Sequence, residues 1–562
     1  YTVSSSVTNV QISSVSGSTK SGDSSDDTHQ FSGSLFISGS RIDLDDGNKN
    51  IALGTQGIAL TTGIQNILVG SDSGDALTSG ARNVAIGVST LSTATTAGMN
   101  VAIGQSAMEN VASGVALEGA IGIGKDALQS VNHANANNSI AIGYQALKSI
   151  TTGPGNTAIG WSAGTAMTTN SSNTIIGYGA FRAADAGEDN NVVIGLDAGA
   201  AINHANADDN VLIGYQAGYG GANSLRQSVA IGSNALDATA ANAVTGLVAI
   251  GYSALTAMTS GTENTAVGYQ AGLSLTTGTK NTFLGYYAGS QAEDDSNNTF
   301  VGRYAGTNVE SDENTFFGTE AGAGVQGTTV GSQNTSIGYR SMYNHTTANK
   351  IVAVGNAALQ LLTTGNQNVH LGFRAGQYNT VGSNMVVIGN EAGRYATGSL
   401  NVFIGANAGK GGTQTAPYSS GTQNVGIGYN ALAAFTTGGD NTAVGYQAGD
   451  AVTSGVRNTI MGMQAATGLT TGQHNVMIGA YVGYQTTDLD GAVLIGYQAG
   501  YGGNMTSAAD GTVAIGFQAM NNLTTGQRNT GVGSGILYTN SSDGDDNTAM
   551  GYQAGFYNYK GG

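Results

Sequence analysis

The pentapeptide GWSAG, from Gly160 to Gly164, has the residue types that come nearest to catalysis in this sequence. It matches the G-x-S-x-G pattern, in which a serine nucleophile lies at a sharp turn between a strand and a helix. Such a serine needs a histidine base and an acid partner. Here Ser162 takes the place that glutamine has in similar segments such as GYQAG at 268–272. We therefore interpret Ser162 as a structural residue, and we predict that the chain is not an enzyme.

The histidines show no spacing that would bind a catalytic metal. No pair is arranged as H-E-x-x-H or H-x-x-x-H, so the usual zinc ligands are absent. Two of them lie in matching NHANA segments, which indicates duplication of a turn. The six are His29, His133, His204, His345, His370 and His474.

Acidic residues cluster at 23–27, 43–46, 293–295 and 543–546. Calcium prefers oxygen-rich loops of this kind. The EF-hand spacing and the glycine-rich calcium-roll repeat are both absent from the sequence, however. We expect solvated turns at these places and no cofactor, with a calcium ion bound at one cluster as the alternative.

The composition excludes several classes of protein. The 562 residues include 90 glycines, 2 prolines and no cysteine, and charged residues make up 9%. A net charge of −17 with only 18 Lys and Arg disfavours nucleic acid, because phosphate binding needs a basic surface. No apolar run approaches the roughly 18 residues of a membrane-spanning helix, so we expect no membrane insertion.

A repeat fills the chain from about residue 50 to its end. Each unit ends in a glycine after the pattern N-[T/V/I]-x-[apolar]-G, and 29 such glycines run from Gly54 to Gly551. Fifteen of the 28 intervals between them are 17 residues long. Short β-branched segments followed by glycine and TTG turns favour strands over helices. The repeat predicts an all-β parallel β-solenoid, or β-roll, with a length on the order of 140 Å at about 4.8 Å per coil.

The strand residues of each unit predict which sides are buried. The residues three and one before the glycine are apolar or threonine in all 29 units, and side chains two apart share one face of a strand. We predict that this face is the core of the roll. The residue between them is also apolar in 24 units, which predicts an oligomer interface on the other face, most simply of a homotrimer. The predicted core includes Val84, Ile86, Thr265, Val267, Val476 and Ile478, and the predicted interface includes Phe283, Phe300, Phe316, Phe403 and His370.

Two further columns accompany the strands. Asparagine precedes the strand in 21 units, as at Asn66 and Asn475, and stacked amides can hydrogen-bond along a solenoid. Aromatic residues such as Tyr144 and Trp161 follow the glycine in about half of the units. We interpret them as a structural aromatic ladder, with an exposed strip for sugar stacking as the alternative.

Segments such as Asn-Thr-Ala-Val-Gly-Tyr-Gln-Ala-Gly at 264–272 and Asn-Val-Ala-Ile-Gly at 83–87 resemble the head repeats of trimeric autotransporter adhesins. They look even more like repeat tracts in fibre proteins of tailed phages, particularly marine ones. The resemblance implies a left-handed β-roll, threefold assembly and a role in attachment. We see no membrane anchor of the adhesin type at the carboxyl end, which favours the phage interpretation.

These observations predict two regions and one leading function. Residues 1–49 are expected to form a Ser- and Asp-rich β segment for attachment or linkage, and residues 50–562 the repeat domain. The leading hypothesis is a structural fibre of a phage tail or virion, which attaches to a host and binds surface glycans or another receptor. The alternative is a bacterial surface adhesin or extracellular filament subunit. A polysaccharide-processing enzyme on a β-helix would need carboxylates clustered in a groove, and the acids here are scattered among turns.

Overall fold

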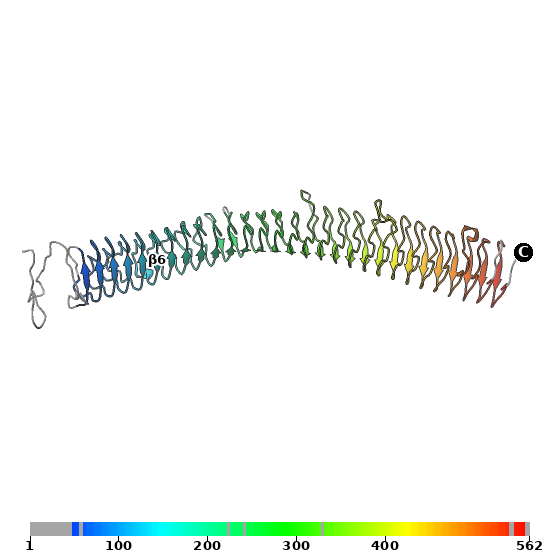
Figure 1. The fold of residues 1–562 in the computed structure, drawn as a ribbon, viewed down its shortest axis with the longest axis horizontal. Coiled ribbons are helices and arrows are strands. Elements are labelled where there is room, and N and C mark those ends of the chain that lie inside the picture. The colour runs from blue at the N-terminus through cyan, green and yellow to red at the C-terminus, as the bar shows by residue number, and fades with distance from the viewer. Residues whose placement is uncertain are drawn as a thin grey trace, which may run out of the picture.

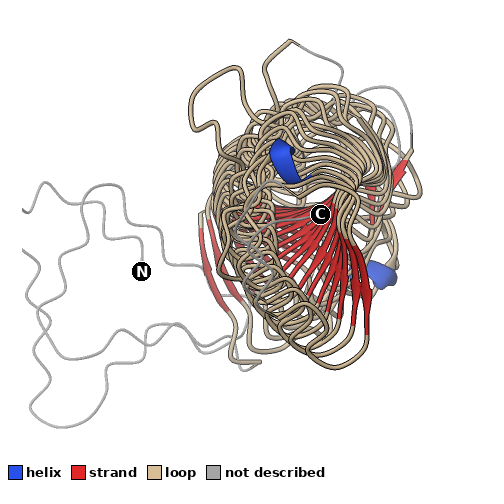
Figure 2. Cartoon of the chain, turned by 90° about the vertical axis from the view of Figure 1, so that its right-hand side faces the viewer, coloured by secondary structure: helices blue, strands red, loops and turns tan. Residues whose placement is uncertain are grey.

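The structure, a computed structural model, describes residues 48–54, 60–221, 225–239, 243–327, 331–538 and 544–556. Over these residues the chain winds into an elongated, gently curved solenoid (Figure 1). Its strands form one 29-stranded parallel sheet along one side, and the turns stack on the other side (Figure 2). The predicted parallel β-solenoid is therefore confirmed. Within the described residues, the predicted amino-terminal segment 1–49 is represented only by residues 48 and 49.

Each strand of the large sheet is three residues long and ends one residue before the repeat glycine. A two-stranded accessory sheet pairs β11 (Leu225–Arg226) with β13 (Val244–Thr245). In the described part of the chain, two 3-10 turns, η1 (Ala134–Ala136) and η2 (Ser507–Ala509), lie among the turns. The strands of the large sheet are β1 (Ile51–Leu53), β2 (Ile67–Val69), β3 (Val84–Ile86), β4 (Val101–Ile103), β5 (Ile121–Ile123), β6 (Ile140–Ile142), β7 (Thr157–Ile159), β8 (Thr174–Ile176), β9 (Val192–Ile194), β10 (Val211–Ile213), β12 (Val229–Ile231), β14 (Val248–Ile250), β15 (Thr265–Val267), β16 (Thr282–Leu284), β17 (Thr299–Val301), β18 (Thr315–Phe317), β19 (Thr335–Ile337), β20 (Val352–Val354), β21 (Val369–Leu371), β22 (Val386–Ile388), β23 (Val402–Ile404), β24 (Val425–Ile427), β25 (Thr442–Val444), β26 (Thr459–Met461), β27 (Val476–Ile478), β28 (Val493–Ile495), β29 (Val513–Ile515), β30 (Thr530–Val532) and β31 (Thr548–Met550).

The strands pair in strict register from coil to coil. In β15 and β16, for example, Thr265 lies beside Thr282, Ala266 beside Phe283, and Val267 beside Leu284. The same register holds across the longest repeat interval, where β23 pairs with β24. Extra residues are therefore accommodated in the turns, because a shift of one residue in a strand would reverse every side chain between core and surface.

The two faces of the sheet are the reverse of those predicted from the sequence. The middle residue of the strand is buried in 27 of the 29 strands, whereas the first and third residues are half-buried or exposed in all of them. Val84, Val267 and Val476 are only half-buried, and Ile86 and Ile478 are 37% and 36% exposed. The residues assigned to the core thus lie, with Thr265, on the outer face. Those assigned to an interface lie inside the roll and are fully buried: Phe283, Phe300, Phe316, Phe403 and His370.

The interior of most coils shows a size match that is consistent with this reversal. The middle strand residue faces the residue four positions after the repeat glycine. Where the first is phenylalanine, as at Phe300, the second is glycine, as at Gly306, and a Cβ atom there would lie 2.5 Å from the ring. Where the first is alanine, as at Ala249, the second is commonly a large residue such as Leu255, and both are buried. In most coils one of the two side chains is large and the other is small, and close packing favours such compensation.

A buried asparagine column runs along the start of the strands, as predicted. The backbone N–H and the side-chain amide of Asn83 both donate to Oδ1 of Asn66, at 2.9 and 3.0 Å. The same amide donates to the carbonyl of Ala97 in the next coil at 2.8 Å. Asn83 is fully buried, so these bonds satisfy polar groups that water cannot reach. The pattern continues through Asn458 and Asn475.

The turn after each repeat glycine is also bonded to both neighbouring coils. Residues two and four positions beyond the glycine have positive φ, as at Ser89 (55°) and Leu91 (53°). The N–H groups of these two residues point in opposite directions along the rod. The Ser89 N–H donates to the carbonyl of Ser71 in the preceding coil, and the Leu91 N–H donates to that of Ala107 in the following one. These bonds offset the cost of left-handed backbone at non-glycine residues.

The apolar core of the described chain falls into three segments. They span Leu68 to Ala321, Met342 to Leu362, and Ala375 to Leu537. Polar side chains occupy the strand position inside the roll at the two boundaries. Ser336 lies at the first boundary, where its hydroxyl donates to the carbonyl of Ser341, and His370 lies at the second. The sheet continues across both boundaries, so only the side-chain packing is interrupted.

Candidate functional site

The outer face of the sheet is an apolar surface that extends along the repeats. It consists of the first and third residues of every strand, which are apolar in most coils and threonine at the first position in eleven. The third residue is well exposed in many coils, as at Leu284 (46%) and Phe317 (55%). Monomeric soluble proteins rarely expose continuous apolar patches of more than a few hundred Å². A face that repeats along the whole sheet is therefore a candidate interaction surface.

Aromatic residues that follow the repeat glycine form stacked ladders on the surface. Tyr144, Trp161 and Tyr178 stack with ring centroids 5.7 and 4.5 Å apart and nearly parallel planes. Tyr252 and Tyr269 repeat this arrangement at 5.2 Å. Within such a ladder, each ring face lies against the next ring. Sugars stack on ring faces, so this geometry favours the structural interpretation of the ladder over an exposed strip for sugars.

Ser162 does not lie in the setting that a nucleophile elbow requires. It follows β7 and is 5% exposed, with a φ of 52°. Its N–H donates to the carbonyl of Tyr144 in the preceding coil. The residues after it form turns, and the described segment up to β8 contains no helix. Its conformation is that of the repeat, since Gln270 occupies the same position with a φ of 52°.

The histidines lie in separate environments. His133 and His204 adopt the same turn, in which Nδ1 accepts the N–H of the residue two positions on, at 3.1 and 3.2 Å. His345 and His370 are fully buried, and His370 forms no hydrogen bond through either ring nitrogen. Burial lowers the pKa of His345 to about 4 and that of His370 to about 3. His474 is exposed, with its Nε2 3.4 Å from Arg457. His29 lies outside the described residues.

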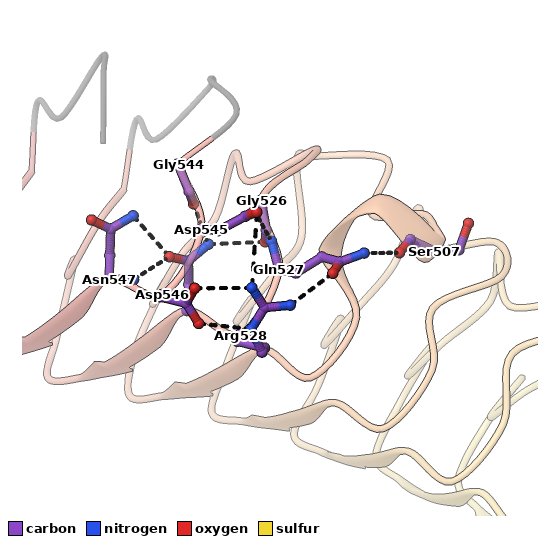
Figure 3. A network of polar contacts seen from close by, with 9 residues as sticks. Ser507, Gly526, Gln527, Arg528, Gly544, Asp545, Asp546 and Asn547 are labelled. Atoms are coloured by element: carbon purple, nitrogen blue, oxygen red, sulfur yellow. Dashed lines mark hydrogen bonds and ion pairs between the residues drawn. The ribbon is translucent and has the colours of Figure 1, made fainter. Parts of the chain in front are cut away.

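The acidic cluster near the carboxyl end forms an ion-paired turn. Arg528 donates to both carboxylate oxygens of Asp546, at 2.7 and 2.9 Å, while Asp545 accepts the N–H of Gln527 at 2.7 Å (Figure 3). The adjacent guanidinium holds the pKa of Asp546 below its usual value. Asp543 and the clusters at 23–27 and 43–46 lie outside the described residues.

The cluster at 293–295 contains one buried carboxylate. Asp295 is 6% exposed, and its Oδ2 atom has no hydrogen-bond partner. Burial, with a smaller contribution from the charge of Asp294, raises its pKa to about 7. In the described part of the chain, no three His, Asp or Glu residues form a group that could hold a metal ion. The alternative of calcium at an acidic turn stays a prediction.

Comparisons with known proteins identify no family. No protein-family model matches the sequence. No curated protein matches it either. Among the described residues, no helix is long and apolar enough to cross a membrane.

The sequence contained a signal that identifies the inner face. Each of the four phenylalanines in the middle strand position is followed six residues later by glycine. Where the middle strand residue is glycine, the residue six positions later is leucine. This is so at Gly122, Gly426 and Gly531. Compensation between two positions indicates that they share one confined space. Comparing these two columns would have placed the middle residue inside the roll.

Proposed function

We propose that this chain forms the shaft of an attachment fibre in a phage tail or virion. The observation that carries the proposal is the unbroken sheet from β1 to β31. At about 4.8 Å per step, its 28 steps give a rod of about 135 Å. Hydrogen bonds between successive coils run through the strands, the asparagine column and the turns. These three sets of hydrogen bonds join every coil to the next. A long rod stabilised in this way is suited to holding a binding element away from a particle.

The outer face of the sheet supports self-association as part of this function. A partner that covers a face of this length must itself have about the same length and coil spacing. Other copies of this chain meet both conditions and carry the same apolar columns. We propose a homotrimer in which three sheets pack around a common axis, with the strand side inward. The proposed oligomer interface therefore consists of the first and third residues of each strand. The sequence pattern predicted an interface at the phenylalanine column, which lies inside the roll.

A charge introduced on this face tests the assembly. Glutamate in place of Leu284, Val301 and Phe317 together would bury charges on three adjacent coils of the interface, and burial of unpaired charges is strongly unfavourable. Light scattering should give about three times 56.2 kDa for the unaltered chain and the monomer mass for the triple variant. The matched control places glutamate at Thr277, Thr347 and Thr364, which are exposed on the turn side. A monomeric unaltered chain would contradict the proposal.

The location of the rods tests the fibre function itself. Gold-labelled antibodies against the chain, applied to its native source and viewed by electron microscopy, should label fibres on virions. Label on cell envelopes or free filaments would instead support the bacterial adhesin or filament subunit. Label confined to the cell interior would reject both attachment functions.

A further inference from the structure

The longest repeat interval, 23 residues from Gly405 to Gly428, builds a loop that stands out from the rod between β23 and β24 (Figure 1). Both ends of this loop are hydrogen-bonded to neighbouring coils. The Gly412 N–H donates to the carbonyl of Phe435, and the Ser419 N–H donates to that of Tyr395 at 3.0 Å. The two ends are also joined to each other, since Ser419 Oγ accepts a hydrogen bond from the N–H of Thr413 at 3.3 Å. The loop is thus held at its base while residues 413–418 stand above the surface.

An aromatic cluster braces one side of the loop. Tyr418 folds back over the two preceding coils, with its ring centroid 5.2 Å from that of Tyr378 and 6.1 Å from that of Tyr395. Tyr378 and Tyr395 stack at 5.0 Å. The guanidinium of Arg394 lies 5.0 Å from the Tyr395 ring and pairs with Glu391 at 2.6 Å. The two ring contacts hold Tyr418 against the rod.

A groove of about 610 Å³ lies between the loop and the turns beneath it. This volume falls within the roughly 300–1,000 Å³ of typical ligand sites. Its floor includes Thr380, Val381 and Thr397 from two successive coils, and its wall includes Pro417 and Tyr418. The floor is accessible, since Val381 is 55% exposed.

The lining of the groove is neutral and rich in hydroxyl groups. Eight of its eleven residues carry a hydroxyl, and none carries a charge. Within the described chain, the hydroxyls of Thr413, Thr415 and Tyr418 form no hydrogen bond, so they are free to bind a ligand. Val381, Ala416 and Pro417 supply apolar contact between them. A ligand that matches this lining presents many hydroxyls, apolar C–H faces and no net charge.

We propose that this groove binds a neutral oligosaccharide, an inference that rests on the attachment function proposed above. The C–H faces of the sugar lie against Pro417, Tyr418 and Val381, and its hydroxyls bond to the threonines. The open shape of the groove, along the rod between the loop and the turns, admits a chain of sugar units. The site gives the rod a lateral binding position part-way along its length.

Binding of the full chain to an array of immobilised neutral and acidic oligosaccharides tests this site. The variant Val381→Glu places a charge on the floor at an exposed position, and Tyr418→Ala removes part of the wall. Each should weaken binding of neutral oligosaccharides about tenfold or more, since a loss of 1.4 kcal/mol corresponds to a factor of ten. Thr471→Glu is the matched control, because Thr471 is exposed at the equivalent turn position of another coil. Circular dichroism should show the same fold for all three variants.

The outcomes separate the groove from the attachment function. Loss of binding in both groove variants, with the control unchanged, supports the proposal. Binding that survives both variants, or that is confined to acidic glycans, overturns it. If no oligosaccharide binds while labelled rods still adhere to cells, attachment stands and the carbohydrate site is wrong. If the rods neither bind the array nor adhere to cells, both proposals fail.

Discussion

At the scale of single residues, His370 replaces an apolar side chain inside the roll. Its buried ring makes no hydrogen bond, and burial lowers its pKa to about 3. In the unfolded chain, histidine titrates near pH 6.5. Between these values a fall in pH adds a proton to the unfolded state alone. The free energy of unfolding should therefore decrease as the pH is lowered from about 6.5 towards 3.

We predict that His370→Phe stabilises the rod. Phenylalanine beside Gly376 would reproduce the pair formed by Phe403 and Gly409, and it removes two unpaired polar atoms. The gain in unfolding free energy should be about 1–3 kcal/mol at neutral pH, and larger at pH 4. Denaturant unfolding at both pH values measures it. The exposed-site control His474→Phe should change stability by less than about 0.5 kcal/mol. A destabilised His370→Phe variant would contradict this prediction.

Asp295 should give a pH dependence of opposite sign. Its folded pKa of about 7 lies above the value of about 3.9 in an unfolded chain, because the carboxylate is buried. Between pH 4 and 7 the folded state keeps a proton that the unfolded state has lost, so stability falls as the pH rises. We predict that Asp295→Asn is more stable than the unaltered chain above pH 7, with a difference that shrinks towards pH 4. In the same denaturation series, Asp294→Asn should have a smaller effect, since Asp294 is exposed.

At the scale of the element, each coil is stabilised by the pair of side chains that fills it. Phe300→Ala should cost about 3–5 kcal/mol, the usual range for removing a buried phenylalanine. Gly306→Leu should also destabilise the coil, because its Cβ would lie 2.5 Å from the Phe300 ring. The double variant should recover most of the loss, since Ala249 and Leu255 form this pair naturally.

A double-mutant cycle measured by denaturant unfolding tests the pairing. We expect a coupling energy above about 1 kcal/mol between positions 300 and 306. Gly306 has a φ of 55°, and Leu255 adopts 50° at the same position, so backbone strain alone does not forbid leucine. As a control, Phe300→Ala combined with Thr471→Glu in a distant coil should be additive. Additivity of Phe300→Ala with Gly306→Leu would contradict the size match.

At the scale of the whole molecule, the rod is a stack in which each coil contacts its neighbours, so stability need not be uniform along it. Among the described residues, the apolar core is interrupted between Ala321 and Met342 and again between Leu362 and Ala375. We predict faster amide hydrogen exchange in the coils around Ser336 and His370 than in those around Phe283 or Ile460. Mass spectrometry of peptides after timed exchange measures this. Uniform protection along the rod would mean that the hydrogen-bonded ladders, which cross both boundaries, dominate stability.

The sequence by itself determined the solenoid, its register and the asparagine column, because these follow from a unit that occurs 29 times. A local repeat constrains every coil in the same way, so no long-range information was needed. It did not determine which face of the strand points inward. In a three-residue strand such as Val84–Ile86, the middle side chain points to one face and the other two point to the opposite face. Because both faces carry apolar residues, the sequence does not indicate which face points inward.

Only the tertiary structure decided that choice and located the groove. The inner face depends on the width of the closed coil, which admits Phe300 only because Gly306 lies opposite. The groove depends on where the loop after β23 folds, and Tyr418 meets Tyr378 across two coils and 40 residues of sequence. Contacts between distant segments depend on the three-dimensional path of the chain. A local sequence pattern contains no information on that path.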